Sequence, residues 1–513
     1  MGRPMAKTVY QPVIGLEIHF QLKTKSKMFC SCANQEVGEP NTFICPICSG
    51  QPGTLSVANR QAVEWVVLIG LAVGGEMQPS FRFERKNYFY PDLPKGYQIT
   101  SANYPPTVGG SITVGDKPIR IHHVHLEEDT GKLTHSADGQ YSLVDLNRAG
   151  APLVELVSEA DFVNGWEAKT FCHELQLILR TLQVSDADME KGQMRCEVNV
   201  SLRPEGQEAY GTKVEIKNIN SFRAVEKAID YEIARQTALL EKGEAVAAET
   251  RGWDEDKHQT VGQRLKEEAG DYRYFPEPDL PAIALDQDLY ERLSGQLPEL
   301  PAKKRQRFID EYGFSLDDAR LLTVDGPTAD YVEQVISELR AWLVSLEGVS
   351  GSADDIWQNN KKKLIKLVGG WLTTGLFGLL KEKGQVMTNV TITPENFAEF
   401  ITLIYQNKIN STAGQVILKE MLATGGDPSD IMSTKDLGQV EDEGQLTTII
   451  NQVIRDNPDI VGQYKKGKKT VIQFLVGQAM KISKGKASPT AIHSLLATAL
   501  DDDSQSDKIP ADD

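Results

Sequence analysis

The spacing of apolar residues changes part-way along this chain of 513 residues, and this change limits the folds that it can adopt. Before about residue 300, short segments alternate apolar and polar residues, as in 13–22, where Glu17 and His19 stand between aliphatic neighbours. Side chains on a strand point alternately to its two faces, so this period of two predicts an antiparallel sheet with one polar face. After about residue 300, apolar residues recur every three to four positions, which is the period of a helix. The pattern therefore predicts an α+β fold, with a largely antiparallel-sheet domain followed by all-α domains.

Proline-rich segments and helix signals divide the chain further. The segments 275–281 and 296–301 mark the predicted end of the sheet domain. The predicted domains are 8–296, 297–405 and 406–500, followed by an acidic tail, 501–513, that we expect to be disordered. Helices are expected to begin at Thr393-Pro394, to span 411–424 before two glycines, and to begin at Ser488-Pro489.

Charge is unevenly distributed along the chain. The net charge of −17 argues against a general nucleic-acid-binding surface, but residues 460–486 contain seven lysines and no acid. Within that segment, 462–468 has the spacing of a phosphate-binding loop. It lacks the expected Ser or Thr after the lysine and a preceding strand, so we interpret it as a basic turn between helices. The longest apolar runs are too short to span a bilayer, and we expect a soluble, cytoplasmic protein.

Four of the six cysteines form the most specific local motif. They are Cys30, Cys32, Cys45 and Cys48. Two close cysteine pairs that flank a short loop can place four thiolates tetrahedrally around zinc. All ligand positions would then be filled by protein, so we predict a structural Zn²⁺ within a module at 28–50. The two other cysteines lie in apolar patterns and are expected in the core.

Acidic residues and histidines gather on predicted polar faces. Glu17 and His19 share one face of a strand, and 122–129 contains three histidines followed by three acids. Because neighbours on a strand point in opposite directions, one of Glu127 and Glu128 can share a site with Glu17 and His19. Carboxylates with one imidazole suit magnesium or manganese, the usual partners of ATP phosphates. Pattern alone nevertheless favours a solvated sheet face.

Eight stretches, in order through nearly the whole chain, resemble the family of B subunits of the aspartyl/glutamyl-tRNA(Asn/Gln) amidotransferases. They are 13–23, 84–100, 125–135, 142–159, 194–204, 213–222, 271–281 and 474–489. The resemblance implies a catalytic cradle domain, a helical domain and a tail domain.

The same resemblance implies a glutamine-hydrolysing ligase that uses ATP and Mg²⁺ in two steps. ATP first phosphorylates the side-chain carboxylate of Glu-tRNA(Gln) and/or Asp-tRNA(Asn), and ammonia then displaces phosphate to give the amide. Phosphorylation supplies the leaving group that a carboxylate lacks, and it requires positive charge around the phosphates. The implied partners are the amidase (glutaminase) A subunit, the small C subunit and misacylated tRNA, in a cytoplasmic heterotrimer without a membrane partner. No amidase segment is visible in the sequence, so ammonia is expected from the partner.

The resemblance also implies roles for individual residues. The implied magnesium ligands are Glu17, His19, Glu128, Glu155 and Glu215. The implied catalytic group is Glu128, Lys86, Lys95, Arg195 and Glu197, with the two lysines on the ammonia entry side. Asn147 and Arg148 are assigned to binding the ATP cofactor. The lysines predicted to bind tRNA phosphates are Lys465, Lys466, Lys468, Lys469, Lys481, Lys484 and Lys486.

Two other functions compete with this interpretation. A non-catalytic tRNA-binding scaffold would explain the basic segment and the structural zinc, but it leaves the acids and histidines unexplained, because they repel RNA phosphate. A stand-alone metal hydrolase acting on RNA would turn over without ATP or glutamine. ATP hydrolysis that depends on misacylated tRNA distinguishes the amidotransferase from the scaffold, and turnover without ATP or glutamine identifies the hydrolase.

Overall fold

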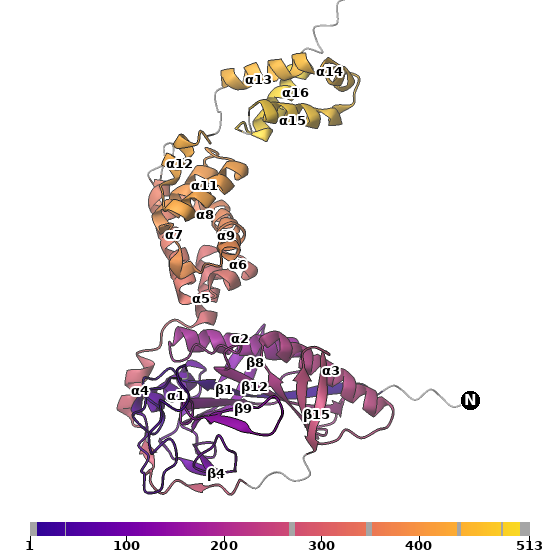
Figure 1. Cartoon of the computed structure of the whole chain (residues 1–513). Helices are drawn as coiled ribbons and strands as arrows, with labels where there is room; N and C mark the ends of the chain where they lie inside the picture. Colours follow the sequence, from indigo (N-terminus) through magenta and orange to yellow (C-terminus); the bar gives the residue numbers. More distant parts are fainter. Residues whose placement is uncertain are drawn as a thin grey trace, which may run out of the picture. The chain divides into compact units, whose positions relative to one another are not determined.

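The computed structural model describes residues 8–35, 37–265, 272–344, 351–438, 443–483 and 486–502. The chain divides into two compact units, Met1–Ala302 and Lys303–Asp513, and each is considered by itself (Figure 1). Unit 1 is built on a large sheet, whereas the described part of unit 2 is helical. The predicted α+β fold class is therefore confirmed.

A largely antiparallel sheet, 13-stranded in the described part of the chain, forms the frame of unit 1. Its central path runs β15-β14-β13-β12-β1-β11-β8-β5-β4-β16, in which β13 and β14 pair in parallel. In chain order these strands are β1 (Tyr10–Gln21), β4 (Glu84–Asn87), β5 (Tyr97–Thr100), β8 (Lys117–Glu128), β11 (Pro152–Ser158), β12 (Met194–Pro204), β13 (Val214–Ile219), β14 (Glu249–Asp254), β15 (Gln259–Leu265) and β16 (Phe275–Pro276). The shorter strands are β2 (Glu76–Met77), β3 (Ser80–Phe81), β6 (Thr107–Val108), β7 (Ser111–Val114), β9 (Lys132–His135), β10 (Ser142–Asp145) and β17 (Ile283–Ala284).

The central strand β1 shows how the sheet acquires one buried and one polar face. Its alternate side chains Ile14, Leu16, Ile18 and Phe20 are at most 1% exposed and belong to the core of unit 1. Helices α2 (Gly165–Thr181) and α3 (Phe222–Glu241) pack against each other over this face (Figure 1). The alternation that predicted β1 is confirmed, and the opposite face is left for polar side chains.

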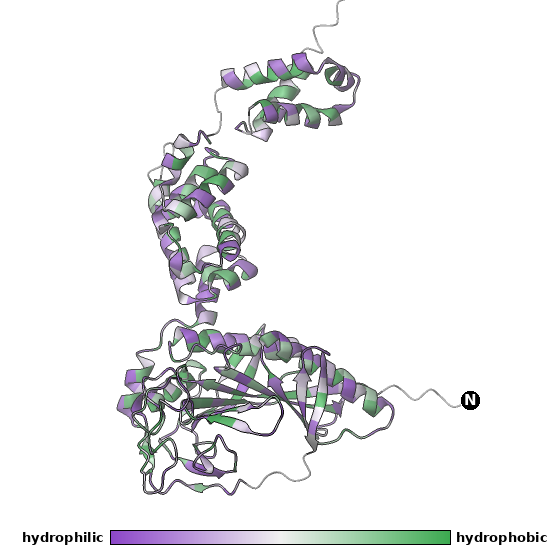
Figure 2. Ribbon diagram, in the orientation of Figure 1, coloured by the Kyte–Doolittle hydropathy of each residue, from purple (hydrophilic) through white to green (hydrophobic). Residues whose placement is uncertain are grey.

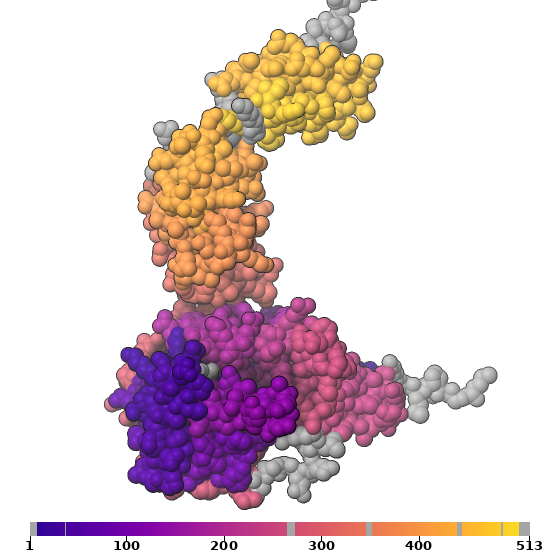
Figure 3. All heavy atoms as spheres, in the orientation of Figure 1, coloured from indigo at the N-terminus to yellow at the C-terminus, as the bar shows by residue number. Residues whose placement is uncertain are grey.

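Two further helices complete unit 1. Helix α1 (Arg60–Ala72) packs on β8, and α4 (Gln287–Ser294) packs on α1. The segment that contains the four cysteines lies between β1 and α1 and has no long helix or strand of its own. In Figure 3 this first part of the chain, in indigo, forms one side of unit 1.

Unit 2 contains two hydrophobic cores among its described residues. One joins buried side chains from Phe308 to Ile431, and the other joins those from Leu446 to Leu500. Apolar and polar stretches alternate along its helices in Figure 2, as the period of 3.6 predicted. Its elements, with α5 at the boundary, are α5 (Pro301–Arg307), η1 (Phe308–Tyr312), α6 (Leu316–Leu322), α7 (Gly326–Val344), α8 (Ala353–Gly370), η2 (Trp371–Leu376), α9 (Phe377–Lys383), η3 (Met387–Asn389), α10 (Pro394–Tyr405), α11 (Ser411–Thr424), α12 (Pro428–Thr434), α13 (Glu443–Asp456), α14 (Pro458–Lys465), η4 (Lys469–Val471), α15 (Ile472–Ile482) and α16 (Pro489–Asp502). The domain boundary at 405/406 stays a prediction.

The predicted helix ends follow from capping residues. The Thr393 side chain accepts a hydrogen bond at the start of α10, and α11 ends at Gly425, whose φ of 70° suits glycine. The predicted basic turn at 462–468 is only partly correct, because α14 extends to Lys465 and the turn begins at Lys466. Pro458 occupies the first turn of α14, where a missing N–H costs nothing.

One helical stretch, Ala353–Lys383, is long and apolar enough to cross a membrane by length and composition. This is weak support for a membrane span, because the core helices of soluble proteins pass the same test. Here Leu364, Ile365, Val368 and Leu372 pack into the core of unit 2. Packing thus accounts for part of the apolar character of this stretch, since 39% of its most apolar window is buried.

Candidate functional site

A row of polar side chains crosses four strands on the polar face of the sheet. In the strand register, His125 on β8 lies opposite Glu155 on β11, Glu155 lies opposite His19 on β1, and His19 lies opposite Arg195 on β12. Cross-strand partners lie about 5 Å apart, so the register itself brings these groups together.

Two groups of this row form a compact site with a third residue on β8, and we call this site the acidic cluster: His19, Glu155 and Glu127. The His19 Nε2 lies 3.1 Å from Glu155 Oε2 and 3.6 Å from Glu127 Oε1. The three ligand atoms lie within 4.8 Å of one another. Two carboxylates and an imidazole at this spacing fit a divalent cation such as Mg²⁺ or Mn²⁺.

The electrostatics of the acidic cluster show that its charges are tightly coupled. Burial alone would lower the pKa of His19, but the carboxylates of Glu155 and Glu127 raise it to about 9. Burial raises the pKa of Glu127 to about 7. Burial would also raise the pKa of Glu155, but His19 and His125 hold it well below its usual value. The site thus concentrates negative charge that one protonated imidazole only partly neutralises.

Lys86 on β4 brings a partly buried positive charge towards the acidic cluster. Burial alone would lower its pKa, but Glu127 and Glu155 raise it above its usual value. Its Nζ also lies 5.0 Å from the centre of the Tyr272 ring, within cation–π range. An ammonium in this position can attract an anionic ligand to the cluster.

The predicted ligands Glu17 and Glu215 lie on the same sheet but make other contacts. Glu17 Oε1 accepts a hydrogen bond of 2.8 Å from Asn199 Nδ2. Lys217 Nζ lies 2.8 Å from Glu197 Oε2 and 3.2 Å from Glu215 Oε1, so these two acids share one lysine. Among the expected ligands, the structure therefore brings His19 and Glu155 directly together.

Glu128, which we expected among the metal ligands, lies outside the acidic cluster. Its Oε2 accepts a hydrogen bond of 2.6 Å from Lys95 Nζ, and its Oε1 accepts one of 2.9 Å from the Ile99 N–H. Glu127 takes the place beside His19 instead. The physical reason is the alternation of a strand, because neighbouring side chains point to opposite faces.

A sequence signal for Glu127 was present. Val124 and Leu126 are apolar and buried, whereas His123 and His125 are polar. Extending this alternation by one step puts Glu127 on the face of the histidines and Glu128 on the other face.

The two residues assigned to ATP are used by the fold itself. Asn147 is 1% exposed, and its Oδ1 accepts hydrogen bonds from the N–H groups of Thr42 (2.8 Å) and Phe43 (2.9 Å). Its Nδ2 donates one of 2.9 Å to the Glu39 carbonyl. The Asn147 side chain thus clamps the cysteine-containing segment rather than facing an open site.

Arg148 and Arg195 converge on a buried carboxylate. Asp129 Oδ2 lies 3.4 Å from Arg148 Nε and 3.6 Å from Arg195 Nη2. Arg148 also donates hydrogen bonds to the carbonyls of Thr130 (3.0 Å) and Gly131 (2.6 Å). Arg148 is therefore engaged by the loop after β8, whereas the Arg195 side chain is 46% exposed and accessible to a ligand.

The four predicted zinc ligands come together in what we call the tetrathiol centre: Cys30, Cys32, Cys45 and Cys48. Their sulfurs all lie within 4.8 Å of one another, and the Sγ atoms of Cys45 and Cys48 are 3.9 Å apart. A tetrahedron with Zn–S bonds of about 2.3 Å has an edge of about 3.8 Å, so the donor set fits zinc. Hydrogen bonds from Cys30 and from the Cys45 N–H, together with the charge of Lys27, lower the pKa of the Cys48 thiol to about 4.

Comparisons with known proteins agree with this geometry. The family described as the GatB/GatE catalytic domain matches residues 12–291, and the one described as the GatB domain matches 356–500. The B subunit of the aspartyl/glutamyl-tRNA(Asn/Gln) amidotransferase of Persephonella marina is 44% identical over 96% of this chain and 99% of the relative. The B subunits of the same enzyme from Carboxydothermus hydrogenoformans and Dehalococcoides mccartyi are 41% and 43% identical over 96% of this chain, covering 99% and 100% of those relatives.

This chain belongs to the family of aspartyl/glutamyl-tRNA(Asn/Gln) amidotransferase B subunits. The resemblance that the sequence motifs indicated is confirmed. The catalytic-domain match covers the acidic cluster, Lys86 and the tetrathiol centre.

The basic segment of this family member lies in unit 2. Lys465, Lys466, Lys468, Lys469 and Lys481 are exposed, and Lys484 lies outside the described residues. Lys469 Nζ lies 2.7 Å from Asp501 Oδ1, and Lys486 forms an ion pair with Asp436. Two of the predicted tRNA-binding lysines are therefore already paired with acids.

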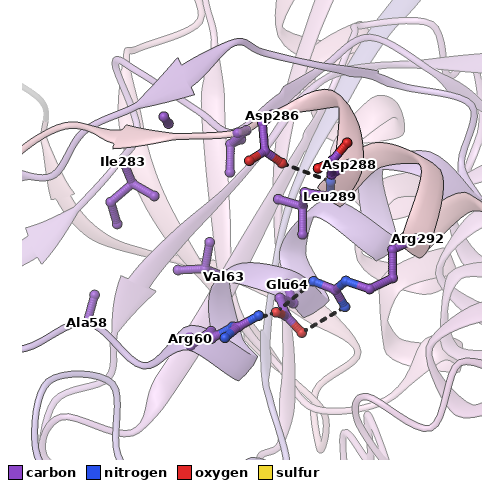
Figure 4. A pocket seen from close by; sticks show the side chains of 11 residues that line it. Ala58, Arg60, Val63, Glu64, Ile283, Asp286, Asp288, Leu289 and Arg292 are labelled. Atoms are coloured by element: carbon purple, nitrogen blue, oxygen red, sulfur yellow. Dashed lines mark hydrogen bonds and ion pairs between the residues drawn. The ribbon is translucent and has the colours of Figure 1, made fainter.

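A separate cavity of about 510 Å³ lies where α1 and α4 meet (Figure 4). Val63, Ile283 and Leu289 contribute apolar surface, and Glu64 Oε1 accepts hydrogen bonds of 2.8 Å from both Arg60 and Arg292. No residue of the acidic cluster lines it. Glu64 is held by two arginines, and nothing in the lining indicates chemistry.

Proposed function

We propose that this chain phosphorylates the side-chain carboxylate of Glu-tRNA(Gln) and/or Asp-tRNA(Asn) with ATP and then converts it to the amide. Ammonia reaches it from the amidase (glutaminase) A subunit, and the small C subunit completes a cytoplasmic heterotrimer. The acidic cluster beneath Lys86 is the observation that supports this catalytic role. Family membership, with relatives named as amidotransferase subunits, favours it over a non-catalytic scaffold.

The residues divide between metal binding and charge compensation. His19, Glu127 and Glu155 would hold Mg²⁺, which neutralises phosphate charge during transfer. Lys86, whose charge is coupled to Glu127 and Glu155, would attract the anionic phosphates, and the exposed Arg195 guanidinium would bind phosphate or the substrate carboxylate. Glu17 and Glu215, which we predicted as metal ligands, and Glu197, which we predicted as a catalytic residue, extend the site along the sheet.

The Lys95–Glu128 pair supports the second step. Lys95 is buried and is held by Glu128, so neither side chain is open to solvent as the structure stands. We place this pair on the ammonia entry side, where a change in its contacts would admit ammonia to the phosphorylated carboxylate. The amide forms when the ammonia nitrogen bonds to the acyl carbon, the bond to phosphate breaks, and a carboxylate accepts the released proton.

The test compares the neighbours Glu127 and Glu128 in the assembled complex with misacylated tRNA. We expect Glu127→Gln to lose both Mn²⁺ binding and tRNA-dependent ATP cleavage while keeping tRNA affinity. Glu128→Gln should keep Mn²⁺ binding, because its carboxylate lies outside the acidic cluster. Normal ATP cleavage by Glu127→Gln would refute the assignment, and turnover of RNA without ATP or glutamine would favour the hydrolase alternative.

We propose that the exposed lysines of the basic segment contact tRNA phosphates. Reversing Lys466 and Lys468 to Glu should raise KM for charged tRNA and flatten the salt dependence of binding, because each lost phosphate contact lowers the salt slope by about one. Lys469→Glu serves as the matched comparison, since Lys469 is already paired with Asp501. Unchanged affinity across a salt titration would show that these lysines are merely solvated.

A further inference from the structure

Lys27 is a buried lysine beside the tetrathiol centre. The residue is 1% exposed, and lysines are almost never buried without an anionic partner. In the described part of the chain, its Nζ has two polar partners, the Cys48 Sγ at 3.6 Å and the Leu146 carbonyl at 3.3 Å. A carbonyl alone does not compensate a buried ammonium, so the sulfur is the counter-ion that the geometry offers.

Lys27 is held at its backbone by the cysteine loop, and its side chain lies close to Gly150. Its backbone N–H donates a hydrogen bond of 3.0 Å to the Cys32 carbonyl, which ties it to the cysteine loop. A Cβ built on Gly150 would lie 3.4 Å from Cys48 Cβ and 3.8 Å from Lys27 Cδ. Gly150, with a φ of +84°, thus allows the chain to pass close to both side chains. The contact with Cys48 is therefore built into the fold.

We propose that Lys27 is the counter-cation of the tetrathiol centre, where its ammonium holds the metal-bound Cys48 thiolate. Four thiolates around one Zn²⁺ leave an excess of about two negative charges, which is unfavourable at the buried Cys48. An N–H···S contact from a cation removes part of this charge and keeps the thiolate from being protonated and lost. Groups that contact metal ligands in this way change metal affinity by about 10- to 100-fold. The inference rests on the zinc assignment, which the metal content of the wild-type chain tests separately.

The experiment measures the rate at which zinc passes from the full chain to a chromogenic chelator. We expect Lys27→Met, which keeps the length of the side chain without its charge, to release zinc about 10-fold faster or more. Lys27→Arg keeps the charge and should stay close to the wild type. Lys23→Met is the matched control, because Lys23 is exposed and pairs with Asp186 at 3.3 Å. Release at the wild-type rate from Lys27→Met would overturn the proposal.

A second readout separates charge from packing. In the Co²⁺-loaded chain, Lys27→Met should shift the sulfur-to-cobalt charge-transfer band to lower energy, because the thiolate loses its hydrogen-bond donor. A purely structural role leaves this band in place. If Lys27→Met does not fold, Lys27→Gln is compared with Lys27→Arg. Equal zinc release from these two variants would show that charge has no part.

Discussion

The tetrathiol centre and the acidic cluster are two candidate metal sites of one unit, and they are assembled in opposite ways. The four cysteines lie within 30–48, so a short loop and a clamp from Asn147 suffice to bring them together. The acidic cluster takes one residue each from β1, β8 and β11, which only the sheet register makes neighbours. The first suits a permanent structural ion, and the second suits a cation that can exchange.

The tetrathiol centre and the acidic cluster also differ in how their charge is compensated. The tetrathiol centre offers four soft thiolates, which fill every ligand position of zinc, and Lys27 is its proposed counter-cation. The acidic cluster has three protein donors and carboxyl groups whose pKa values are driven apart. Carboxyl groups with pKa values shifted in this way occur mainly at functional sites. The two sites should therefore respond differently to substitution.

The largest effect is expected from breaking the tetrathiol centre. Cys48→Ser should remove most of the bound zinc and lower the melting temperature of unit 1 by about 10 °C, because several kcal/mol of metal-linked folding energy are lost. Calorimetry together with metal analysis measures both. Gln51→Ala, an exposed neighbour, is the control. Wild-type zinc content in Cys48→Ser would exclude the proposed ligand set.

The next effect tests the acidic cluster through catalysis rather than stability. Glu155→Gln should lower tRNA-dependent ATP cleavage by about 10³-fold, since a lost metal ligand removes several kcal/mol of transition-state stabilisation. Single-turnover cleavage measures this, and zinc content should stay unchanged. A parallel fall in both quantities would mean that the two sites are not independent.

A smaller effect is expected at the clamp between the cysteine-containing segment and the sheet. Asn147→Ala leaves two N–H groups and one carbonyl without their partner, which should cost about 3 kcal/mol of unfolding free energy. Denaturant titration measures this cost, with Asn41→Ala as the comparison for an exposed clamp of the same loop. If KM for ATP rose while stability did not change, Asn147 would be an ATP ligand after all.

The smallest effect concerns the stability cost of a buried carboxylate. The pKa of Glu127 is raised from its ordinary 4.5 to about 7, so its ionisation destabilises the fold above pH 7. Without divalent metal, Glu127→Gln should therefore stabilise the chain by about 2 kcal/mol at pH 8. The gain should shrink as the pH falls from 7 and disappear below 4.5, where the carboxyl is protonated in both states. A gain that does not depend on pH would point to packing instead.

The sequence by itself determined the elements and the local site. Period-two alternation identified β1 and β12, the caps at Thr393 and Gly425 identified two helices, and cysteine spacing identified the ligands of the tetrathiol centre. These features depend on residues within a few positions of one another. Local propensity and short loops therefore suffice to specify them.

Only the tertiary structure decided which acids meet, and which polar residues the fold uses for itself. Strand register selected Glu127 rather than Glu128 for the acidic cluster, because one step along a strand reverses the face. Long-range contacts committed Asn147 to the cysteine-containing segment and placed Lys27 against Cys48. Such pairings join residues that are distant along the chain, and their geometry is fixed by packing of the whole unit rather than by local sequence.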